Sequence, residues 1–321
     1  MKVELEDILS TLRVIRIPMR TPFRGLEYRE TAIFQGPSGW GEFAPFVEYD
    51  DVEASQWLRC GIEQAFGKPS EIKRDLIPIN GTIPATESKP VIEELVSLYQ
   101  GAQVFKIKVG TSLSRDIERI SIVRALAPRA KIRIDVNAEW SVSEALTNLR
   151  AIYSEVTGSD LEYVEQPVGS IAELKELKDK LGMEIKIAGD EIIRKAKDPF
   201  ALDLYGAIDV LMLKAGPLGG IERSLKIAAH HRIPVVVSSA LESAVGISHG
   251  LRLAAALPEL SFACGLATGA LFTADVAIHQ IVDGAIKVKA PEPERLENLI
   301  APSERIEWWR DRIKKVWQVM N

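Results

Sequence analysis

Short runs of apolar residues recur along most of the chain, with amphipathic stretches between them. Eight such runs cover residues 77–83, 104–109, 132–136, 161–164, 185–188, 210–213, 235–237 and 262–266. Segments with the apolar spacing of helices lie between them, at residues 91–99, 117–126, 143–156 and 171–181. Strands that alternate with helices predict a parallel sheet, and eight of them are enough to close a barrel. An open doubly wound sheet is the alternative, but no G-x-G-x-x-G follows the first strand.

The first 80 residues have a different pattern. Residues 12–18 and 30–34 are short β-rich runs, and a glycine-rich turn at residues 36–41 reverses the chain into another strand. Residues 51–66 have apolar side chains at helical spacing and are followed by Gly67. The pattern therefore predicts an α+β domain over residues 1–80, followed by a barrel domain over residues 81–285.

Composition narrows the class of protein. The chain has 321 residues, of which 46% are hydrophobic, so it can bury a large core. A net charge of -5 gives no reason to expect a nucleic acid or membrane partner. Glu4 lies where a signal peptide would need apolar residues, and Cys60 and Cys264 are too far apart in sequence for a metal knuckle or redox pair. We therefore expect a cytoplasmic protein without a membrane span.

Two lysines occupy one face of the predicted strand at residues 104–109. Lys106 and Lys108 are two residues apart, so their side chains point the same way while those of Phe105 and Ile107 point the opposite way. In a buried sheet, repulsion between the two ammonium groups and desolvation would each lower a lysine pKa, which is how a lysine becomes a base near neutral pH. The alternative is an edge strand with a solvated lysine face.

Carboxylates come at the ends of three successive predicted strands, in Asp135, Glu165 and Asp190. The carboxyl ends of barrel strands meet at one face, so these groups should converge there. Converging carboxylates repel one another without a cation between them, and oxygen ligands suit Mg²⁺, with Mn²⁺ as a substitute. Direct pairing with lysines is the alternative. The other strand ends carry Asn137, Glu191, Lys214, Ser238, Ser239 and Gly265.

These groups together favour removal of a carbon-bound proton. A divalent cation that binds a substrate carboxylate can stabilise the enediolate formed when the α-proton leaves, and lysines on either side can move protons. The expected partner is therefore a small-molecule carboxylate. Lys214 could instead be a salt-bridge partner on the barrel rim.

Several motifs resemble the muconate-lactonizing-enzyme subgroup of the enolase superfamily. They are Lys106-Ile-Lys108, Asp135-Val-Asn137, Glu165-Gln-Pro167, Gly189-Asp-Glu191, Leu213-Lys-Ala-Gly216 and, near the N-terminus, Gly39-Trp-Gly-Glu-Phe-Ala-Pro45. The resemblance implies an α/β fold: a modified TIM barrel, (β/α)7β, under an N-terminal α+β capping domain that residues 286–321 help to complete.

Within the subgroup, residues 238–243 and 263–270 most resemble o-succinylbenzoate synthases of the menaquinone pathway, of the shorter actinobacterial type. Dipeptide epimerases of the subgroup carry Asp-x-Asp at the end of the eighth strand to bind an ammonium group. Here that region reads Gly265-Leu-Ala-Thr-Gly269, which suits a substrate without an amine.

The resemblance also implies roles for individual residues. Asp135, Glu165 and Asp190 would bind Mg²⁺. Lys108 would abstract the α-proton and protonate the departing hydroxyl, with Lys106 tuning it and Lys214 stabilising the planar intermediate from the opposite face. Substrate contacts or support for the ligands are expected of Glu191, Asn137, Arg133, Ser238, Ser239 and Gly265. Arg24 lies on a family loop that closes over substrate, or on the surface.

Three other functions stay open at this point. N-succinylamino-acid racemization is one, because both lysines needed for two-base chemistry are present. Muconate-type cycloisomerization is another. A catalytically silent barrel that binds a small acid is the alternative outside the enzymes, although such a protein has no need of two buried bases. The sequence does not predict the oligomeric state.

Overall fold

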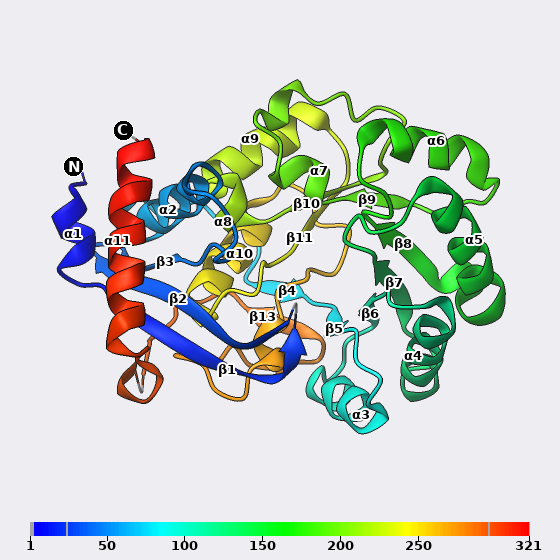
Figure 1. The fold of residues 1–321 in the computed structure, drawn as a ribbon, viewed down its shortest axis with the longest axis horizontal. Helices are drawn as coiled ribbons and strands as arrows, with labels where there is room; N and C mark the ends of the chain where they lie inside the picture. The colour runs from blue at the N-terminus through cyan, green and yellow to red at the C-terminus, as the bar shows by residue number, and fades with distance from the viewer. Residues whose placement is uncertain (1–2, 24, 295, 321) are drawn as a thin grey trace.

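The computed structural model describes residues 3–23, 25–294 and 296–320. Within them, seven parallel strands form one curved sheet in the order β11-β10-β9-β8-β7-β6-β5. The strands are β5 (Gly81–Ile83), β6 (Val104–Lys108), β7 (Lys131–Asp135), β8 (Leu161–Glu165), β9 (Ile187–Gly189), β10 (Val210–Leu213) and β11 (Val235–Val237). The helices of this unit are α3 (Lys89–Leu98), α4 (Leu113–Leu126), α5 (Val142–Ile152), α6 (Ile171–Leu181), α7 (Glu191–Arg194), α8 (Ala215–Leu218), α9 (Ile221–His231) and α10 (Ala244–Ala256). The predicted alternation of strand and helix is confirmed (Figure 1).

Two of the eight predicted strands differ from expectation. The run at residues 77–83 is split: β4 (Leu76–Pro78) pairs antiparallel with β13 (Ala285–Lys287), and only β5 joins the barrel. The run at residues 262–266 makes only isolated parallel bridges, from Cys264 to Ile79 and from Gly265 to Ser238. These bridges close the ring between β5 and β11. Gly265 permits the close approach, because a Cβ there would lie 2.4 Å from the Ser238 hydroxyl oxygen.

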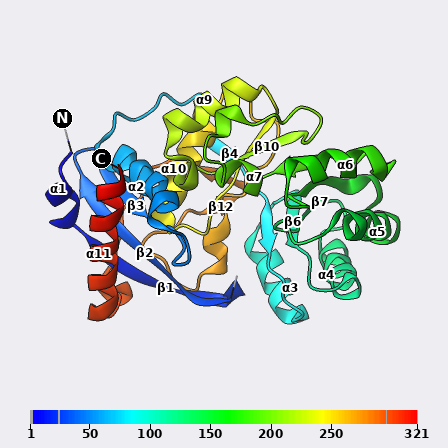
Figure 2. The same cartoon turned by 45° about the horizontal axis from the view of Figure 1, so that its top comes forward.

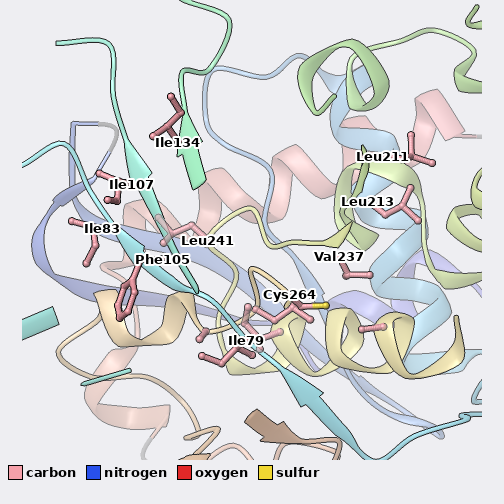
Figure 3. Close-up of a cluster of buried hydrophobic side chains, with 14 of the residues drawn as sticks. Ile79, Ile83, Phe105, Ile107, Ile134, Leu211, Leu213, Val237, Leu241 and Cys264 are labelled. Carbon is pink, nitrogen blue, oxygen red and sulfur yellow. The ribbon is translucent and has the colours of Figure 1, made fainter. Parts of the chain in front are cut away.

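Alternation along each barrel strand separates two sets of side chains. Ile107, Ile134 and Leu211 belong to the large apolar cluster that the surrounding helices share (Figure 3). A smaller buried cluster draws on the opposite strand faces, and it consists of Tyr163, Ala188, Val210, Met212 and Val236. The apolar positions therefore fix which face of each strand turns inward, and the polar residues at the strand ends lie on that inward face.

A second layer stands beside the barrel, and we call it the cap. It consists of α1 (Leu5–Leu9), the antiparallel strands β1 (Arg13–Phe23), β2 (Leu26–Gly36) and β3 (Gly39–Phe43), α2 (Asp51–Phe66) and α11 (Ser303–Met320). The C-terminal helix packs between α1 and α2 (Figure 1), and its Trp309 meets Phe43 edge-on at 5.8 Å between ring centroids. The two ends of the chain thus share one hydrophobic core.

The remaining elements are short. They are β12 (Ile281–Val282), the π-helix η1 (Tyr153–Thr157), and the 3₁₀ turns η2 (Gly158–Asp160), η3 (Pro199–Ala201), η4 (Thr268–Leu271) and η5 (Leu296–Leu299). No helix in the described part of the chain is long and apolar enough to span a bilayer.

Two cap carboxylates bind helix N-termini of the barrel. Glu42 accepts hydrogen bonds from the Ser243 hydroxyl at 2.5 Å and the Gly246 backbone N–H at 2.6 Å, in the first turn of α10. Glu63 accepts one from the Ile221 backbone N–H at 2.5 Å, at the start of α9. Orphan N–H groups at helix starts attract carboxylates. These bonds fix the cap against the side of the barrel that carries α9 and α10 (Figure 2).

Glu242 gives the protein a predicted pH dependence of stability. Its side chain is buried, and burial together with the nearby Glu42 charge raises its pKa from 4.5 to about 7, against the attraction of Arg29. Between pH 4.5 and about pH 7 the folded chain therefore holds a proton that the unfolded chain has released. Stability falls as pH rises through this window, by on the order of 3 kcal/mol.

The variant Glu242→Gln cannot ionise and should lose this part of the pH dependence. Urea unfolding of both proteins at about pH 5 and at about pH 7.5 measures it. The parent should lose more unfolding free energy between the two conditions than the variant does. An equal loss in both proteins would show that Glu242 titrates alike in the folded and unfolded states.

Candidate active site

The strand ends surround one cavity that the cap covers. Its volume is about 50 Å³. Its barrel lining includes Lys106, Lys108, Asp135, Asn137, Asp190, Glu191, Lys214, Ser238 and Ser239, and its cap lining includes Phe23, Phe46, Tyr49 and Trp57. Ligand cavities are usually several hundred Å³, so side chains or the cap must shift to admit a substrate. A larger cavity of about 480 Å³ is lined in part by residues between 266 and 272, and none of the strand-end lysines lines it.

Lys106 is buried between two carboxylates. Its ammonium nitrogen lies 2.8 Å from Glu165 Oε2 and 3.2 Å from Asp135 Oδ2. Burial alone would lower the Lys106 pKa, but the charges of Glu165 and Asp135 outweigh it and raise the pKa well above its ordinary value. The expectation of a lowered pKa is therefore wrong for Lys106, because it counted the neighbouring lysine and missed partners that only the fold brings near.

Lys108 is held at the cavity edge. Its ammonium nitrogen donates to Asp135 Oδ2 at 2.5 Å and to Asn137 Oδ1 at 2.6 Å. Asn137 has a left-handed φ of 54°, which asparagine tolerates better than most residues, and this turn at the end of β7 returns its amide to Lys108. The Phe23 ring of the cap lies 5.8 Å from the same nitrogen. Lys108 therefore contacts residues of both the barrel and the cap.

Asp135 and Asp190 each bind a lysine and stay ionised. Burial alone would raise both pKa values, but Lys108 and Lys106 lower that of Asp135, and Lys214 and Arg194 lower that of Asp190. Lys214 donates to Asp190 Oδ2 at 2.5 Å. The direct pairing of carboxylates with lysines, kept above as an alternative, is present in this structure.

Glu165 is the one of these three carboxylates whose negative charge is not fully offset by the nearby lysines. Burial and the negative charge of Asp135 raise its pKa to about 7, in spite of Lys106. The next residue, Gln166, is fully buried, and its side-chain oxygen accepts the Asp190 backbone N–H at 3.0 Å. Gln166 therefore ties the end of β8 to the end of β9 and sets two of the predicted metal ligands relative to each other.

Arg194, which the sequence interpretation did not single out, also lines the cavity. Its guanidinium donates to Glu191 Oε1 at 3.0 Å and to Asp190 Oδ2 at 3.4 Å. The spacing of three and four residues on one helix was a signal that could have found it. Asn137 Nδ2 reaches the same Glu191 oxygen at 3.2 Å.

Some predicted residues lie apart from the cavity. Arg133 is buried among Glu162, Asn80 and the Ala263 carbonyl, and does not line it. Gly265 serves strand contact, as described above. Ser238 and Ser239 do line the cavity, and the Ser239 hydroxyl shares a hydrogen bond with Thr268 at 2.7 Å. Arg24 lies outside the described residues.

The donor set fits a divalent cation. Three buried carboxylate oxygens have no hydrogen-bond partner: Glu165 Oε1, Asp190 Oδ1 and Glu191 Oε2. Leaving such oxygens unsatisfied is costly, and an oxygen-seeking cation satisfies them. Among the described residues, no three acidic, histidine or cysteine side chains are already arranged around one metal position. Binding therefore requires carboxylates to turn away from the lysines that hold them here.

Comparison with known proteins identifies the family of this fold. The family described as enolase C-terminal domain-like matches residues 91–294, and the enolase N-terminal domain-like family matches residues 14–65. The o-succinylbenzoate synthase of Mycobacterium ulcerans is 48% identical over 322 residues, which cover 98% of this chain and 96% of that protein.

Two solved structures share the fold at low identity. One is the N-succinyl Arg/Lys racemase of Bacillus cereus, with a TM-score of 0.74 and 21% identity over 91% of this chain and 97% of that one. The other is the muconate lactonizing enzyme of Pseudomonas fluorescens, with a TM-score of 0.70 and 21% identity over 93% of this chain and 97% of that one. The enolase-like family that matches residues 91–294 and the near-full-length relative show that the chain belongs to the enolase superfamily, and within it to the o-succinylbenzoate synthase family.

Proposed function

We propose that this protein is a lyase that dehydrates 2-succinyl-6-hydroxy-2,4-cyclohexadiene-1-carboxylate to 2-succinylbenzoate, a step of menaquinone biosynthesis. The observation that carries the proposal is the ring of buried lysines and carboxylates at the barrel strand ends, in a chain 48% identical to an o-succinylbenzoate synthase. The division into a barrel under a cap, and a cytoplasmic location, are part of the same proposal.

Asp135, Glu165 and Asp190 would hold the metal ion. Enzymes of this family depend on a divalent metal, and we propose Mg²⁺, with Mn²⁺ as a substitute, because the donors are carboxylates. A bound divalent cation supplies positive charge beside the substrate carboxylate, where negative charge grows as the α-proton leaves.

Lys108 is the proposed base. The neutral Lys108 amine takes the proton from the ring carbon that bears the carboxylate, and the electron pair moves into the carboxylate. As that pair returns to form the ring double bond, the neighbouring carbon–oxygen bond breaks. The Lys108 ammonium gives its proton to the departing hydroxyl, which leaves as water. One group serves both steps, so proton and hydroxyl leave from the same face, and the ring becomes aromatic.

The other polar residues support this chemistry. Lys106, held by Glu165 and Asp135, keeps positive charge near the carboxylate. Lys214 follows β10, which three strands separate from β6, so in the closed barrel it lies across the cavity from Lys108. Its cation is placed to face the ring of the planar intermediate. Ser238 and Ser239 are the proposed polar contacts to substrate, and Asn137 and Glu191 support Lys108 and the ligands.

Product identification tests the dehydration. Purified protein is incubated with the cyclohexadiene substrate and Mg²⁺, and the product is examined by mass spectrometry and ultraviolet absorbance. A product lighter by one water, with the absorbance of an aromatic ring, is the expected result. A protein that holds metal and leaves the substrate unchanged would have a different function.

Racemization is the second candidate, because Lys108 and Lys214 face each other as two bases would. The test is incubation of N-succinylamino acids in D₂O. Incorporation of deuterium at the α-carbon, followed by nuclear magnetic resonance, would establish racemization as a second activity. A dedicated dehydratase, a cycloisomerase and a catalytically silent barrel would all leave that proton in place. The dehydration assay then separates them, because only the dehydratase would convert its substrate.

A further inference from the structure

Arg194 joins the strand-end carboxylates to the cap. Its side chain is only 7% exposed and extends from α7 at the end of β9. On the barrel side it binds Asp190 and Glu191, as described above. On the cap side one guanidinium nitrogen lies 3.2 Å from the Tyr49 hydroxyl and 3.8 Å from Glu53 Oε1. A single cation thus contacts both halves of the cavity wall.

The contacts of Arg194 leave one oxygen of each acid unpaired. On Asp190, Oδ2 accepts from Arg194 and Lys214, while Oδ1 is buried without a partner. On Glu191, Oε1 accepts from Arg194 and Asn137, while Oε2 is buried without a partner. Two consecutive carboxylates therefore each have one oxygen tied to the arginine and one without a partner. Leaving a buried carboxylate oxygen without a partner costs free energy, and a cation that binds there would remove that cost.

We propose that Arg194 is a positioning residue for the metal site, and that its bond to Tyr49 makes metal affinity depend on the cap. The inference rests on the proposed role of Asp190 as a metal ligand. Arg194 holds one oxygen of Asp190 and one of Glu191, which limits the rotation of both carboxylates and keeps their unpaired oxygens available to a cation while the rest of the site rearranges. Tyr49 in turn fixes the guanidinium.

Arg194 supports metal binding through the geometry of its guanidinium and not through its charge. A positive charge beside a metal site by itself repels the metal, so removing charge alone would tighten metal binding. The planar guanidinium reaches Asp190, Glu191 and Tyr49 through different nitrogens. A lysine ammonium is a single point and cannot hold this spread of partners. Charge and geometry therefore predict opposite effects for Arg194→Met, and for Arg194→Lys, which keeps the charge, only geometry predicts weaker binding.

The test measures Mn²⁺ binding to the full-length protein without substrate, from the electron paramagnetic resonance signal of free Mn²⁺. Arg194→Met and Arg194→Lys should each weaken binding about 10–100-fold, the range found when groups that orient metal ligands are lost. Tyr49→Phe should weaken it less, and should add nothing in the Arg194→Met background. At saturating Mn²⁺, turnover by Arg194→Lys should return close to that of the parent.

Arg74→Met is the matched control. This guanidinium also binds several groups, the carbonyls of Ala254, Leu257 and Pro258, and it touches no residue of the cavity. Its replacement should leave Mn²⁺ affinity unchanged. Arg194→Lys and Tyr49→Phe keep the test decisive where Arg194→Met does not fold.

The outcomes separate this inference from the proposed function. Equal or tighter Mn²⁺ binding by both Arg194 variants would overturn the positioning role and leave the metal site intact. A Tyr49→Phe effect that persists undiminished in the Arg194→Met protein would overturn the link to the cap. Failure of the parent protein to bind Mn²⁺ would instead refute the proposed metal site.

Discussion

Replacing Lys108 with alanine should lower kcat for dehydration by about 10²–10⁴-fold, the usual contribution of a general base or acid, while Mn²⁺ still binds. Lys108 lines the cavity and binds Asp135 and Asn137. Its side chain is still 15% exposed, so these partners do not enclose it. Steady-state absorbance measurements at saturating metal give kcat, and Mn²⁺ binding reports whether the site is intact.

Two further variants sharpen this prediction. Lys108→Arg keeps the positive charge but cannot give up its proton at neutral pH, so it should be as inactive as the alanine variant. Lys175→Ala, which removes a lysine whose exposed partner is Asp203 on the outer surface, should keep full activity. If Lys108→Ala retained activity within a few fold of the parent, another group would be the base.

Glu165→Gln should weaken Mn²⁺ binding by more than the roughly 100-fold seen for residues that only support metal ligands, and turnover should fall with it. Glu165 is the ligand best suited to this test. Its pKa is already raised to about 7, so the fold tolerates an uncharged group there. The amide oxygen can still accept from Lys106. Loss of Asp190 would instead leave the buried Lys214 without its carboxylate partner. Loss of Asp135 would leave Lys108 with the Asn137 amide oxygen alone.

Calorimetric titration with Mn²⁺ measures this affinity, and thermal unfolding of the variant shows whether its fold is kept. Gln166→Glu is an unsuitable control, because Gln166 binds the Asp190 backbone; Glu162→Gln, on the same strand but paired with Arg133, is the appropriate one. Parent-like Mn²⁺ affinity in Glu165→Gln would remove Glu165 from the ligand set.

Spacing in the sequence was sufficient to predict the strand-end residues, because period-two alternation and the parallel order of strands carry Lys106, Asp135 and Glu165 to one layer. The protonation of Lys106 was not predictable in this way. Burial would lower its pKa, but Glu165, 59 residues away in sequence, and Asp135 raise it, because the sheet brings their oxygens within 2.8 Å and 3.2 Å.

The cap residues that line the cavity were also not predictable from the sequence. Tyr49 and Trp57 line the cavity because Glu42 and Glu63 bind helix starts of the barrel, a docking that no local pattern encodes. The eighth strand was predicted from an apolar run, yet only two bridges form there. Cys264 exchanges backbone hydrogen bonds with Pro78 and Asn80 on one side, and Gly265 does so with Val237 and Ser239 on the other.

One time course tests whether dehydration by this protein depends on the metal. The purified protein is given 2-succinyl-6-hydroxy-2,4-cyclohexadiene-1-carboxylate with Mg²⁺, then excess EDTA, then excess Mg²⁺ again, while the absorbance of substrate is followed. We predict rapid loss of substrate, arrest on chelation and recovery when the metal returns. If the substrate persisted although Mn²⁺ binds, the protein would not be a dehydratase of this substrate. If EDTA left turnover unchanged, the dehydration would not depend on the metal.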